Sequence, residues 1–239
     1  MSEISILIPS FKEYENLNYL LPKISESIDN NFKPHIVNVI VIDCVELDQK
    51  TKVLCEKFGY TYINRGPTNS FGDALRSGID YVKKNLTTSE WVIVMDSDGS
   101  HDPGLFQEFS KFINSNSIDL VIASRYVKGG STENNFILIF LSLVVNFIYR
   151  KYFNLNVKDV SNNFRLYSFN TLRNLKLEEK NFEIVEEILI KIIKNDKNIK
   201  IVEIPSRFLI RKYGKSKRNL IAFTISYLKS LNRLKRFTK

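Results

Sequence analysis

The sequence predicts one α/β domain built on a mostly parallel β-sheet, and three observations support this prediction. From residue 4 to residue 124, short runs rich in β-branched residues alternate with longer helical patterns. The short runs end at polar turns, as strands of parallel sheets do. No repeat, low-complexity stretch or Gly/Ser linker divides the 239 residues, of which 44% are apolar, so the chain can bury a sizeable core.

The elements follow in order along the first half of the chain. Strands are expected at "ISILIP" (4–9) and "HIVNVIVID" (35–43), separated by a helix whose apolar residues recur on one side. The remaining expected elements are a helix "TKVLCEKFG" stopped by Gly59, a strand "YTYIN", a helix "FGDALRSGIDYVKKN", a strand "EWVIVMD", a helix "GLFQEFSKFINS" and a strand "DLVIAS". The alternation predicts a doubly wound sheet with helices on its faces.

Acidic side chains mark the ends of the predicted strands. The chain has "SFKEYEN" after Pro9, Asp43 at the end of the second strand, and "DSDGSH" after a third. Ligands of such sheets bind beyond the carboxyl ends of the strands, where these residues should gather.

Asp96 and Asp98 have two interpretations from spacing alone. Carboxylates two residues apart, with Gly99 permitting an unusual turn, suit Mg²⁺ or Mn²⁺, which keep open positions for substrate phosphates. Alternatively the segment is an exposed loop in which Asp102 or Ser100 caps the helix before Pro103. We assign Asp102 to this capping role.

The charge balance favours anionic partners. The formal net charge is +9, and residues 205–239 contain eleven Lys and Arg but no Asp or Glu. Such a segment suits the phosphates of nucleic acid, nucleotide or anionic lipid. Cys44 and Cys55 lack metal or redox spacing, and "MSEISILIP" leads directly into a strand. We therefore expect a protein that faces the cytosol.

Seven motifs follow one another along the chain: "IPSFKEYENL", "VID", "RGPTNSFGDALRSG", "MDSDGSHDP", "DLVIASRYVKGG", "DVSNNFRLY" and "EIPSRFLIRKYGKSK". Together they resemble the family 2 glycosyltransferases, and within them the polyprenyl- (dolichyl-) phosphate mannose synthases. The resemblance covers roughly residues 4–217. It implies a GT-A, Rossmann-like fold over residues 1–218, which takes a nucleotide-sugar donor and Mg²⁺ or Mn²⁺.

The resemblance also implies a donor site in the first half of the chain. Asp96 and Asp98 would hold the metal and the donor diphosphate, with Asp98 also counted as catalytic. Pro9 and Glu13 would line the nucleotide pocket, with Asp43 at the base or ribose. Gly72 keeps the family pattern of the donor loop. Cys44 stands where the family usually has a second acid, so the choice between GDP and UDP stays open.

In the second half, the resemblance places the acceptor and the closing loop. Arg125, Asp159 and Arg165 are counted as catalytic residues on this side: Arg125 would face the acceptor phosphate, and Asp159 and Arg165 would line the acceptor site. A structural ion pair between Asp159 and Arg165 is an alternative. Arg211 and Lys217 would bind the donor diphosphate. A lipid phosphate is already anionic near neutral pH, so in-line attack with inversion needs positioning and charge stabilisation more than a strong base.

Two segments suggest contact with a membrane surface. Residues 136–149 carry no charge, but are shorter than the ~20 residues needed to span a bilayer. Residues 220–237 form an amphipathic basic pattern typical of interface helices. We expect interface helices at 136–150 and 219–239 and a peripheral protein on the cytosolic face. Packing of both segments on the core, or in a homodimer, is the alternative.

The sequence thus predicts transfer of a hexosyl unit, mannose or glucose, from a GDP- or UDP-sugar to polyprenyl phosphate, without a nucleic-acid partner. Three alternatives stay open at this point. They are a family 2 transferase that acts on a glycan or other non-lipid acceptor, a nucleotidyltransferase that makes nucleotide sugars, and a non-enzymatic basic membrane module.

Overall fold

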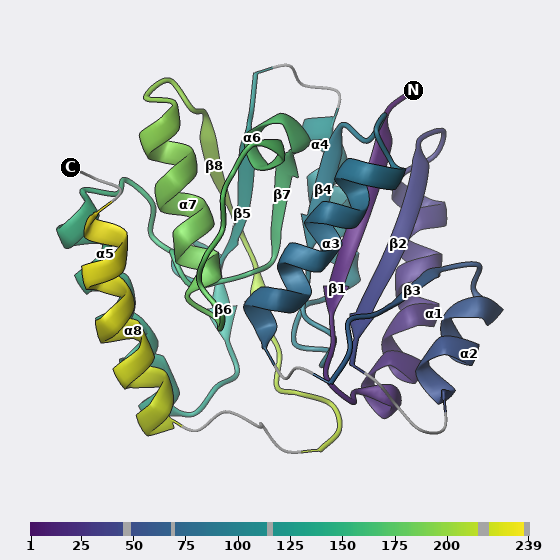
Figure 1. The fold of residues 1–239 in the computed structure, drawn as a ribbon, viewed down its shortest axis with the longest axis horizontal. Coiled ribbons are helices and arrows are strands. Elements are labelled where there is room, and N and C mark those ends of the chain that lie inside the picture. Colours follow the sequence, from purple (N-terminus) through teal and green to yellow (C-terminus); the bar gives the residue numbers. More distant parts are fainter. Residues whose placement is uncertain (45–48, 68–69, 114–116, 215–219, 237–239) are drawn as a thin grey trace.

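The chain folds around a seven-stranded sheet with helices on both faces in the computed structural model (Figure 1). The structure describes residues 1–44, 49–67, 70–113, 117–214 and 220–236, without the side chains of 220–225 and 228. In chain order the elements are β1 Glu3–Pro9, α1 Tyr14–Asn31, β2 Ile36–Asp43, α2 Lys50–Lys57, β3 Thr61–Asn64, α3 Phe71–Asn85, β4 Trp91–Val94, a 3₁₀ turn Pro103–Leu105, α4 Phe106–Ile113, β5 Leu120–Ser124, β6 Ser131–Thr132, α5 Phe136–Phe153, β7 Arg165–Ser168, α6 Phe169–Arg173, α7 Ile184–Asn195, β8 Ile201–Pro205, β9 Arg207–Phe208 and α8 Leu220–Lys235.

The strands lie in the order β3-β2-β1-β4-β7-β5-β8, and β6 pairs with β9 in a separate two-stranded sheet. All neighbours in the large sheet are parallel except β7, which runs antiparallel to both β4 and β5. The predicted mostly parallel sheet flanked by helices is therefore confirmed. The antiparallel β7 was not predicted. Its four residues, RLYS, include charged and polar side chains and are too few to show the alternation of a strand.

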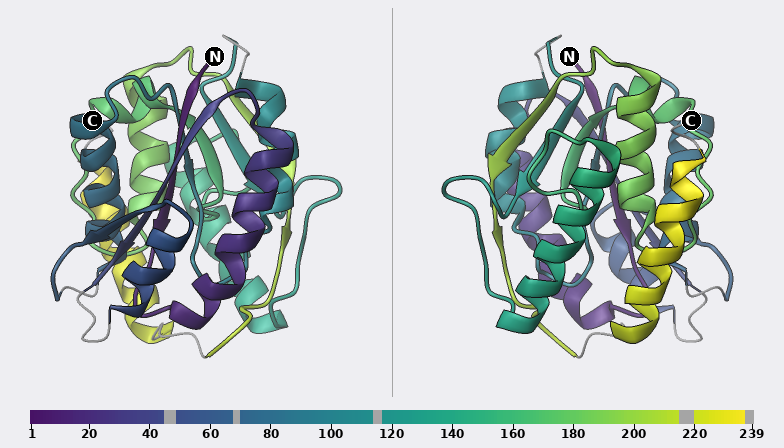
Figure 2. Two further views of the ribbon diagram at one scale, coloured as in Figure 1. Left: turned by 90° about the vertical axis from the view of Figure 1, so that its right-hand side faces the viewer. Right: turned by 90° about the vertical axis from the view of Figure 1, so that its left-hand side faces the viewer.

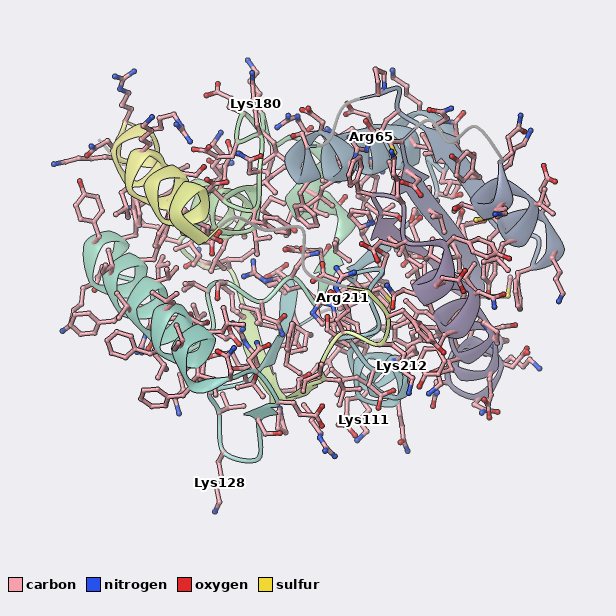
Figure 3. The ribbon with its side chains drawn as sticks, turned by 90° about the horizontal axis from the view of Figure 1, so that it is seen from below. Arg65, Lys111, Lys128, Lys180, Arg211 and Lys212 are labelled. Carbon is pink, nitrogen blue, oxygen red and sulfur yellow. The ribbon has the colours of Figure 1, made fainter. Side chains whose placement is uncertain are left out.

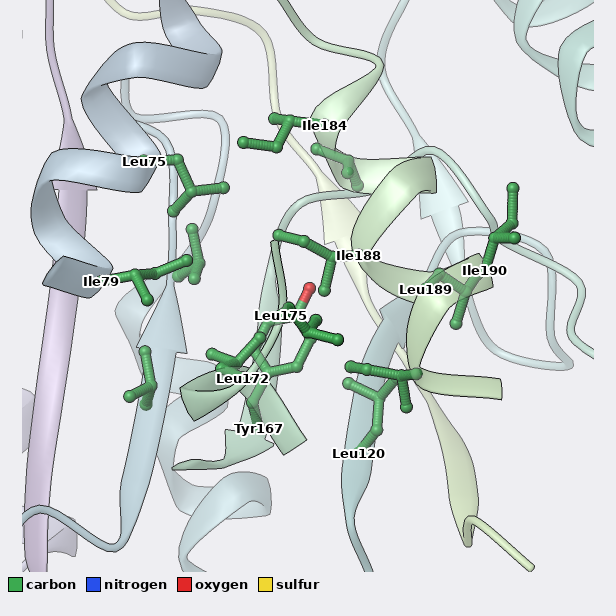
Figure 4. Close-up of a cluster of buried hydrophobic side chains, with 14 of the residues drawn as sticks. Leu75, Ile79, Leu120, Tyr167, Leu172, Leu175, Ile184, Ile188, Leu189 and Ile190 are labelled. Atoms are coloured by element: carbon green, nitrogen blue, oxygen red, sulfur yellow. The ribbon is translucent and has the colours of Figure 1, made fainter. Parts of the chain in front are cut away.

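The alternating side chains of the central strands divide the core into two layers. Ile4, Ile6 and Ile8 of β1 pack on one face with α1 and α4. Leu7 points to the other face, where α3, α6 and α7 cover the sheet. Figure 4 shows part of this second layer, in which Leu75 of α3 and Ile188 of α7 lie over the strands. Because both faces are covered, the central strands β1 and β4 are buried along almost their whole length.

A close approach of main chains joins α3 to the segment before α7. A Cβ atom on Gly72 would overlap the carbonyl oxygen of Glu179, so a larger residue fits only if this main chain moves. The Gly72 N–H donates to the Lys180 carbonyl at 2.8 Å. Glu187 of α7 holds this segment from the other side, since its carboxylate accepts from the main-chain N–H groups of Glu178 and Glu179.

Helices α5 and α8 lie side by side at the end of the sheet formed by β8 (Figures 1 and 2). The Tyr149 hydroxyl of α5 hydrogen-bonds with Ser230 of α8, and Tyr227 and Leu234 of α8 are buried in the core. The apolar side of the described part of α8 therefore packs on the protein. This differs from the expectation that it faces a membrane, because α5 and α7 already offer it an apolar surface.

Candidate active site

Several of the predicted site residues lie at one edge of the sheet, as its topology requires. Strands β1, β2 and β4 are parallel, so Pro9, Asp43 and the segment after Val94 reach the same edge of the sheet. Because β7 runs in the opposite direction, its first residue, Arg165, also begins at this edge. Figure 3 looks onto this side of the molecule, with Arg211 well inside the outline and Lys128 pointing away from it.

Asp43 is completely buried at the end of β2 and organises the turn after β1. One carboxylate oxygen accepts from the main-chain N–H groups of Lys12 at 3.1 Å and Cys44 at 2.8 Å. The other accepts from the Ser10 hydroxyl at 3.1 Å. Lys12 has a positive φ of 56°, which bends the chain back toward Asp43 after Pro9 ends β1. The carboxylate thus shapes the predicted nucleotide pocket, and its contact with a base or ribose stays a prediction.

Asp98 belongs to a tight turn after β4 and carries a stabilised negative charge. Gly99 has a φ of +81°, and Ser100 donates to Asp98 through its N–H at 3.1 Å and its hydroxyl at 2.6 Å. Burial by itself would raise the pKa of Asp98, but the Ser100 hydroxyl and the charge of Arg211 outweigh it, and the pKa lies below its ordinary value. Asp98 is therefore anionic at neutral pH.

Asp96 is held through its main chain by His101 of the same turn and through its side chain by Asn163 of the segment before β7. Its N–H donates to Nδ1 of the buried His101 at 2.9 Å, and its Oδ1 accepts from the Asn163 amide at 3.2 Å. Because Nδ1 is an acceptor, the neutral ring carries its proton on Nε2 and donates to Asn162 Oδ1 at 3.0 Å. His101 also stacks on Phe164 at 4.8 Å between ring centroids. It orients the acidic turn.

Asp102 has the capping role that the sequence predicted. Its Oδ1 accepts from the Gly104 N–H at 2.9 Å, directly before the 3₁₀ turn that begins at Pro103.

Arg211 joins the acidic turn to the beginning of α1. Its Nη1 donates to Glu13 Oε2 at 2.6 Å, and its Nη2 lies 3.3 Å from Asp98 Oδ2. The main-chain N–H of Lys212 also donates to the Asp98 carbonyl at 3.2 Å. The contact places Glu13, Asp98 and Arg211 together, as expected of residues that line one pocket. Lys217, the other predicted diphosphate ligand, lies outside the described residues.

Arg125 and Asp159 form a buried, two-point ion pair at the end of β5. Arg125 Nε and Nη2 donate to the two carboxylate oxygens at 2.8 and 2.7 Å, and the Arg125 N–H adds a third bond at 2.9 Å. Burial would lower the pKa of Arg125, but the charge of Asp159 raises it above its ordinary value. Burial would likewise raise the pKa of Asp159, which Arg125 instead lowers. Both groups therefore stay charged.

Arg165 lies beneath the site rather than within reach of solvent. It is completely buried, and its guanidinium donates to the carbonyl oxygens of Val160 at 2.6 Å and Val185 at 3.0 Å. It therefore fixes the turn before β7 against the start of α7. The partner of Asp159 is Arg125, so the alternative of an ion pair between Asp159 and Arg165 is wrong. An acceptor-lining role for Arg165 stays a prediction that this burial does not favour.

Helix α5 is attached to the Arg125 site by its polar side. Ser142 accepts from the Tyr126 hydroxyl at 2.8 Å. Asn146 accepts from the Val160 N–H at 2.6 Å and donates to Ser161 at 3.2 Å, and Ser161 also accepts from Arg125 at 2.8 Å. The opposite side of the helix is exposed, through Phe136, Ile137, Phe140, Leu143, Val144 and Phe147.

The acidic turn is suited to a divalent metal ion that substrate groups complete. Asp96 and Asp98 supply hard oxygen ligands, and their side chains are 15% and 21% exposed. The part of the chain that the structure describes contains no group of three or more His, Cys, Asp and Glu placed to hold a metal. Two carboxylates nevertheless fit Mg²⁺ or Mn²⁺, which retain waters and bind substrate phosphates.

Several residues of the site were not predicted as functional. Asn162, Asn163 and Ser100 fix the acidic turn, and Asn16 binds the segment after Arg211. Ser100 acts on Asp98, two residues away, whereas the three asparagines depend on partners distant in sequence. Only their place inside the quoted motifs offered a signal.

Comparisons with known proteins show what the chain is similar to. The family model described as "Glycosyl transferase family 2" matches residues 5–176. A dolichol-phosphate mannosyltransferase of Pyrococcus furiosus is 30% identical over 240 residues, covering 97% of this chain and 63% of the relative. A polyprenol monophosphomannose synthase of Mycolicibacterium smegmatis is 26% identical, covering 89% of this chain and 79% of the relative. The chain thus spans less than two thirds of the Pyrococcus protein.

Solved structures share the fold. Glucosyl-3-phosphoglycerate synthase of Mycobacterium tuberculosis, in complex with Mn²⁺, UDP and phosphoglyceric acid, superposes with a TM-score of 0.67 at 17% identity, covering 95% of this chain and 75% of that one. Its complex with Mg²⁺ and UDP gives 0.65 at 16%, covering 96% and 79%. At such identities the likeness supports the GT-A fold alone. Because the family model matches well over half of its length, the chain belongs to glycosyl transferase family 2.

Proposed function

We propose that this protein is a metal-dependent, inverting glycosyltransferase that moves a hexosyl unit from a nucleotide sugar to polyprenyl phosphate at the cytosolic face of a membrane. One observation carries the choice of a lipid acceptor. The polar side of α5 is hydrogen-bonded to the Arg125–Asp159 site, while its opposite, apolar side is exposed. A lipid phosphate needs both environments within reach of one another.

The donor side is supported by the charges around the acidic turn. Asp96 and Asp98 would hold Mg²⁺ or Mn²⁺, which would neutralise charge on the leaving diphosphate. Arg211, between Glu13 and Asp98, brings a permanent positive charge to the same place. Asp43 keeps the turn after β1 in the shape of a pocket wall. These residues bind and orient a nucleoside diphosphate without a strong base.

On the acceptor side, Arg125 is prepared to bind a phosphate. Its Nε and Nη2 donate to Asp159 and Ser161, and none of the described residues accepts from Nη1. The N–H groups of Nη1 are therefore left to donate to a phosphate oxygen in a charge-assisted hydrogen bond. Since Asp159 holds the guanidinium by two bonds, little side-chain entropy is lost when the phosphate binds.

The exposed face of α5 supports binding in a membrane interface. By length and composition, α5 is the one helix in the described chain apolar enough to cross a bilayer, with a mean hydropathy of 1.6 and 17% of its residues buried. Its polar side is bonded to the protein, so we propose that it lies along the interface. Lys229, Lys235 and Arg236 of the neighbouring segment are exposed and would attract anionic headgroups.

Transfer from a defined donor tests the proposal. The protein is incubated with GDP- or UDP-hexose, detergent-solubilised polyprenyl phosphate, and Mg²⁺ or Mn²⁺, and the glycolipid is identified by mass spectrometry. We expect product with the metal, none in EDTA, and none from Asp98→Asn. Asp102→Asn is the matched control, since Asn also caps helices and its activity should stay. Transfer by Asp98→Asn with unchanged metal dependence, or transfer to a glycan but not to the lipid, would contradict the proposal.

Flotation with anionic vesicles tests the membrane surface. Exchanging Phe140 and Phe147, which are 56% and 62% exposed, for Ser removes apolar area from α5 without opening the core. Insertion of each phenylalanine side chain into the membrane should stabilise vesicle binding by about 2 kcal/mol, so the vesicle affinity of the double variant should fall by more than tenfold. Val53→Ser on α2, 61% exposed, is the control. Equal flotation of all proteins would refute this part.

A further inference from the structure

A buried asparagine of α1 joins the helix to the main chain just after Arg211. Asn16 is 2% exposed and belongs to the first turn of α1. Its Oδ1 accepts from the Tyr213 N–H at 2.9 Å, and its Nδ2 donates to the Tyr213 carbonyl at 3.1 Å. The side-chain amide therefore bonds both the N–H and the carbonyl group of Tyr213, as the backbone of a neighbouring strand would.

The same amide also reaches the carboxylate that holds Arg211. Asn16 Nδ2 lies 2.6 Å from Glu13 Oε2, the oxygen that accepts from Arg211 Nη1 at 2.6 Å. Both ends of the short segment 211–213 are thus anchored on the first residues of α1. The rings of Tyr19 and Tyr213 pack edge to face at 6.3 Å, and Lys212 lies over Tyr19 at 5.2 Å.

Helix formation does not require an asparagine at this position. Asn is a poor helix former, and an apolar or small side chain would suit a buried first-turn position better. All of its polar atoms are used, and all their partners are Glu13 and the backbone of Tyr213. The side chain therefore acts on the segment that carries Arg211.

We propose that Asn16 is a positioning residue of the donor site, which clamps the backbone of Tyr213 and thereby holds the Arg211 guanidinium where it meets the diphosphate of a nucleotide donor. The inference rests on the proposed function for the identity of the ligand. Without the clamp, the backbone of Tyr213 loses its two hydrogen bonds to α1, and Arg211 must be ordered further each time a nucleotide binds. Donor affinity then falls, while binding of the acceptor lipid at Arg125 is unaffected.

Hydrogen exchange tests the clamp without any ligand. In the wild-type protein the Tyr213 amide should be protected, and in Asn16→Ala it should exchange about 5- to 30-fold faster, as expected from the loss of one or two hydrogen bonds. Asn31→Ala is the matched control, because this amide on the same helix donates only to the carbonyl and hydroxyl oxygens of Ser27. An unprotected Tyr213 amide in the wild-type protein would overturn the proposal even if Asn16→Ala did not fold.

Calorimetry with GDP or UDP and Mg²⁺ tests the consequence for the donor. Asn16→Ala should weaken nucleotide binding about 5- to 30-fold and raise the donor KM, with the KM for polyprenyl phosphate unchanged. In an Arg211→Ala background, Asn16→Ala should cause less than a twofold further loss, because it acts through Arg211. Independent, multiplying losses would overturn the positioning role. A wild-type protein that binds neither nucleotide would contradict the proposed function, and the exchange experiment would still decide on the clamp.

Discussion

Replacing Glu186 by Gln should change how the stability of the protein depends on pH. Glu186 lies in the first turn of α7, is completely buried, and accepts a hydrogen bond from the Tyr227 hydroxyl of α8 at 3.2 Å. Burial raises the pKa of Glu186 to about 8, although the charge of Arg165 opposes this shift. The carboxyl is therefore neutral in the folded protein at pH 7.

The sign and the size follow from the two pKa values. Below the ordinary value of 4.5, the carboxyl is protonated in both the folded and the unfolded chain, and its contribution is fully present. As pH rises from 4.5 toward 8, only the unfolded chain ionises, so stability is progressively lost. At 1.36 kcal/mol per pH unit, the free energy of unfolding falls by about 2.5 kcal/mol between pH 5 and pH 7. Above pH 8 the total loss levels off at about 5 kcal/mol.

Urea unfolding at pH 5, 6 and 7 measures this loss directly. Gln cannot ionise, so the free energy of unfolding of Glu186→Gln, relative to wild type, should rise by about 2.5 kcal/mol from pH 5 to pH 7. Burial also raises the pKa of Glu183, but that group is present in both proteins and cancels in the difference. The exposed Glu26→Gln serves as a control whose curve should run parallel to wild type.

Parallel curves for wild type and Glu186→Gln would refute the reasoning. They would mean that water or a cation reaches the carboxylate and that it is ionised in the folded protein. A constant offset between the two curves would not matter, because it reports the packing of the amide rather than ionisation.

Two further substitutions test contacts on which the site depends. Asp159→Asn should lower the free energy of unfolding by about 3 to 5 kcal/mol, because it leaves the guanidinium of Arg125 buried without its counter-charge. Glu133→Gln, which breaks the exposed pair with Arg207, should have a much smaller effect in the same urea titration, and equal losses would show that burial is irrelevant. Gly72→Ala should cost about 1 to 3 kcal/mol, since the new Cβ must displace the main chain of residues 179–180. Unchanged stability would mean that this segment moves away freely.

The first half of the fold was predictable because its signals are local. The run 4–9 became β1, and the apolar periodicity of residues 14–28 became α1, which extends to Asn31. Gly59, with a φ of +68°, ended the helical region of α2 as expected. Short elements with mixed polarity gave no such signal. The antiparallel β7 depends on pairing with two strands that lie far away in sequence. Its paired residues in β4 are at least 71 positions earlier and those in β5 at least 43, so a local pattern could not reveal it.

The candidate site divides in the same way. Asp43, Asp96 and Asp98 could be expected together, because the carboxyl ends of parallel strands share one edge. The sequence could not identify which side chains form ion pairs in the site. The sequence allowed Asp159 to pair with Arg165, yet the direction of β7 turns Arg165 into the core and leaves Arg125 beside Asp159.

By itself, the sequence determined the class of the fold, the family and the edge of the sheet where the acids meet, since these follow from periodicity and from motifs in order. Only the tertiary structure decided that the described part of α8, through Tyr227 and Leu234, packs its apolar side on the protein while α5 leaves its own exposed. It also decided that Asn16 holds the segment of Arg211. An amphipathic pattern predicts that one face of a helix is buried, but it does not identify the surface that buries it. That surface depends on which other elements the folded chain places next to the helix.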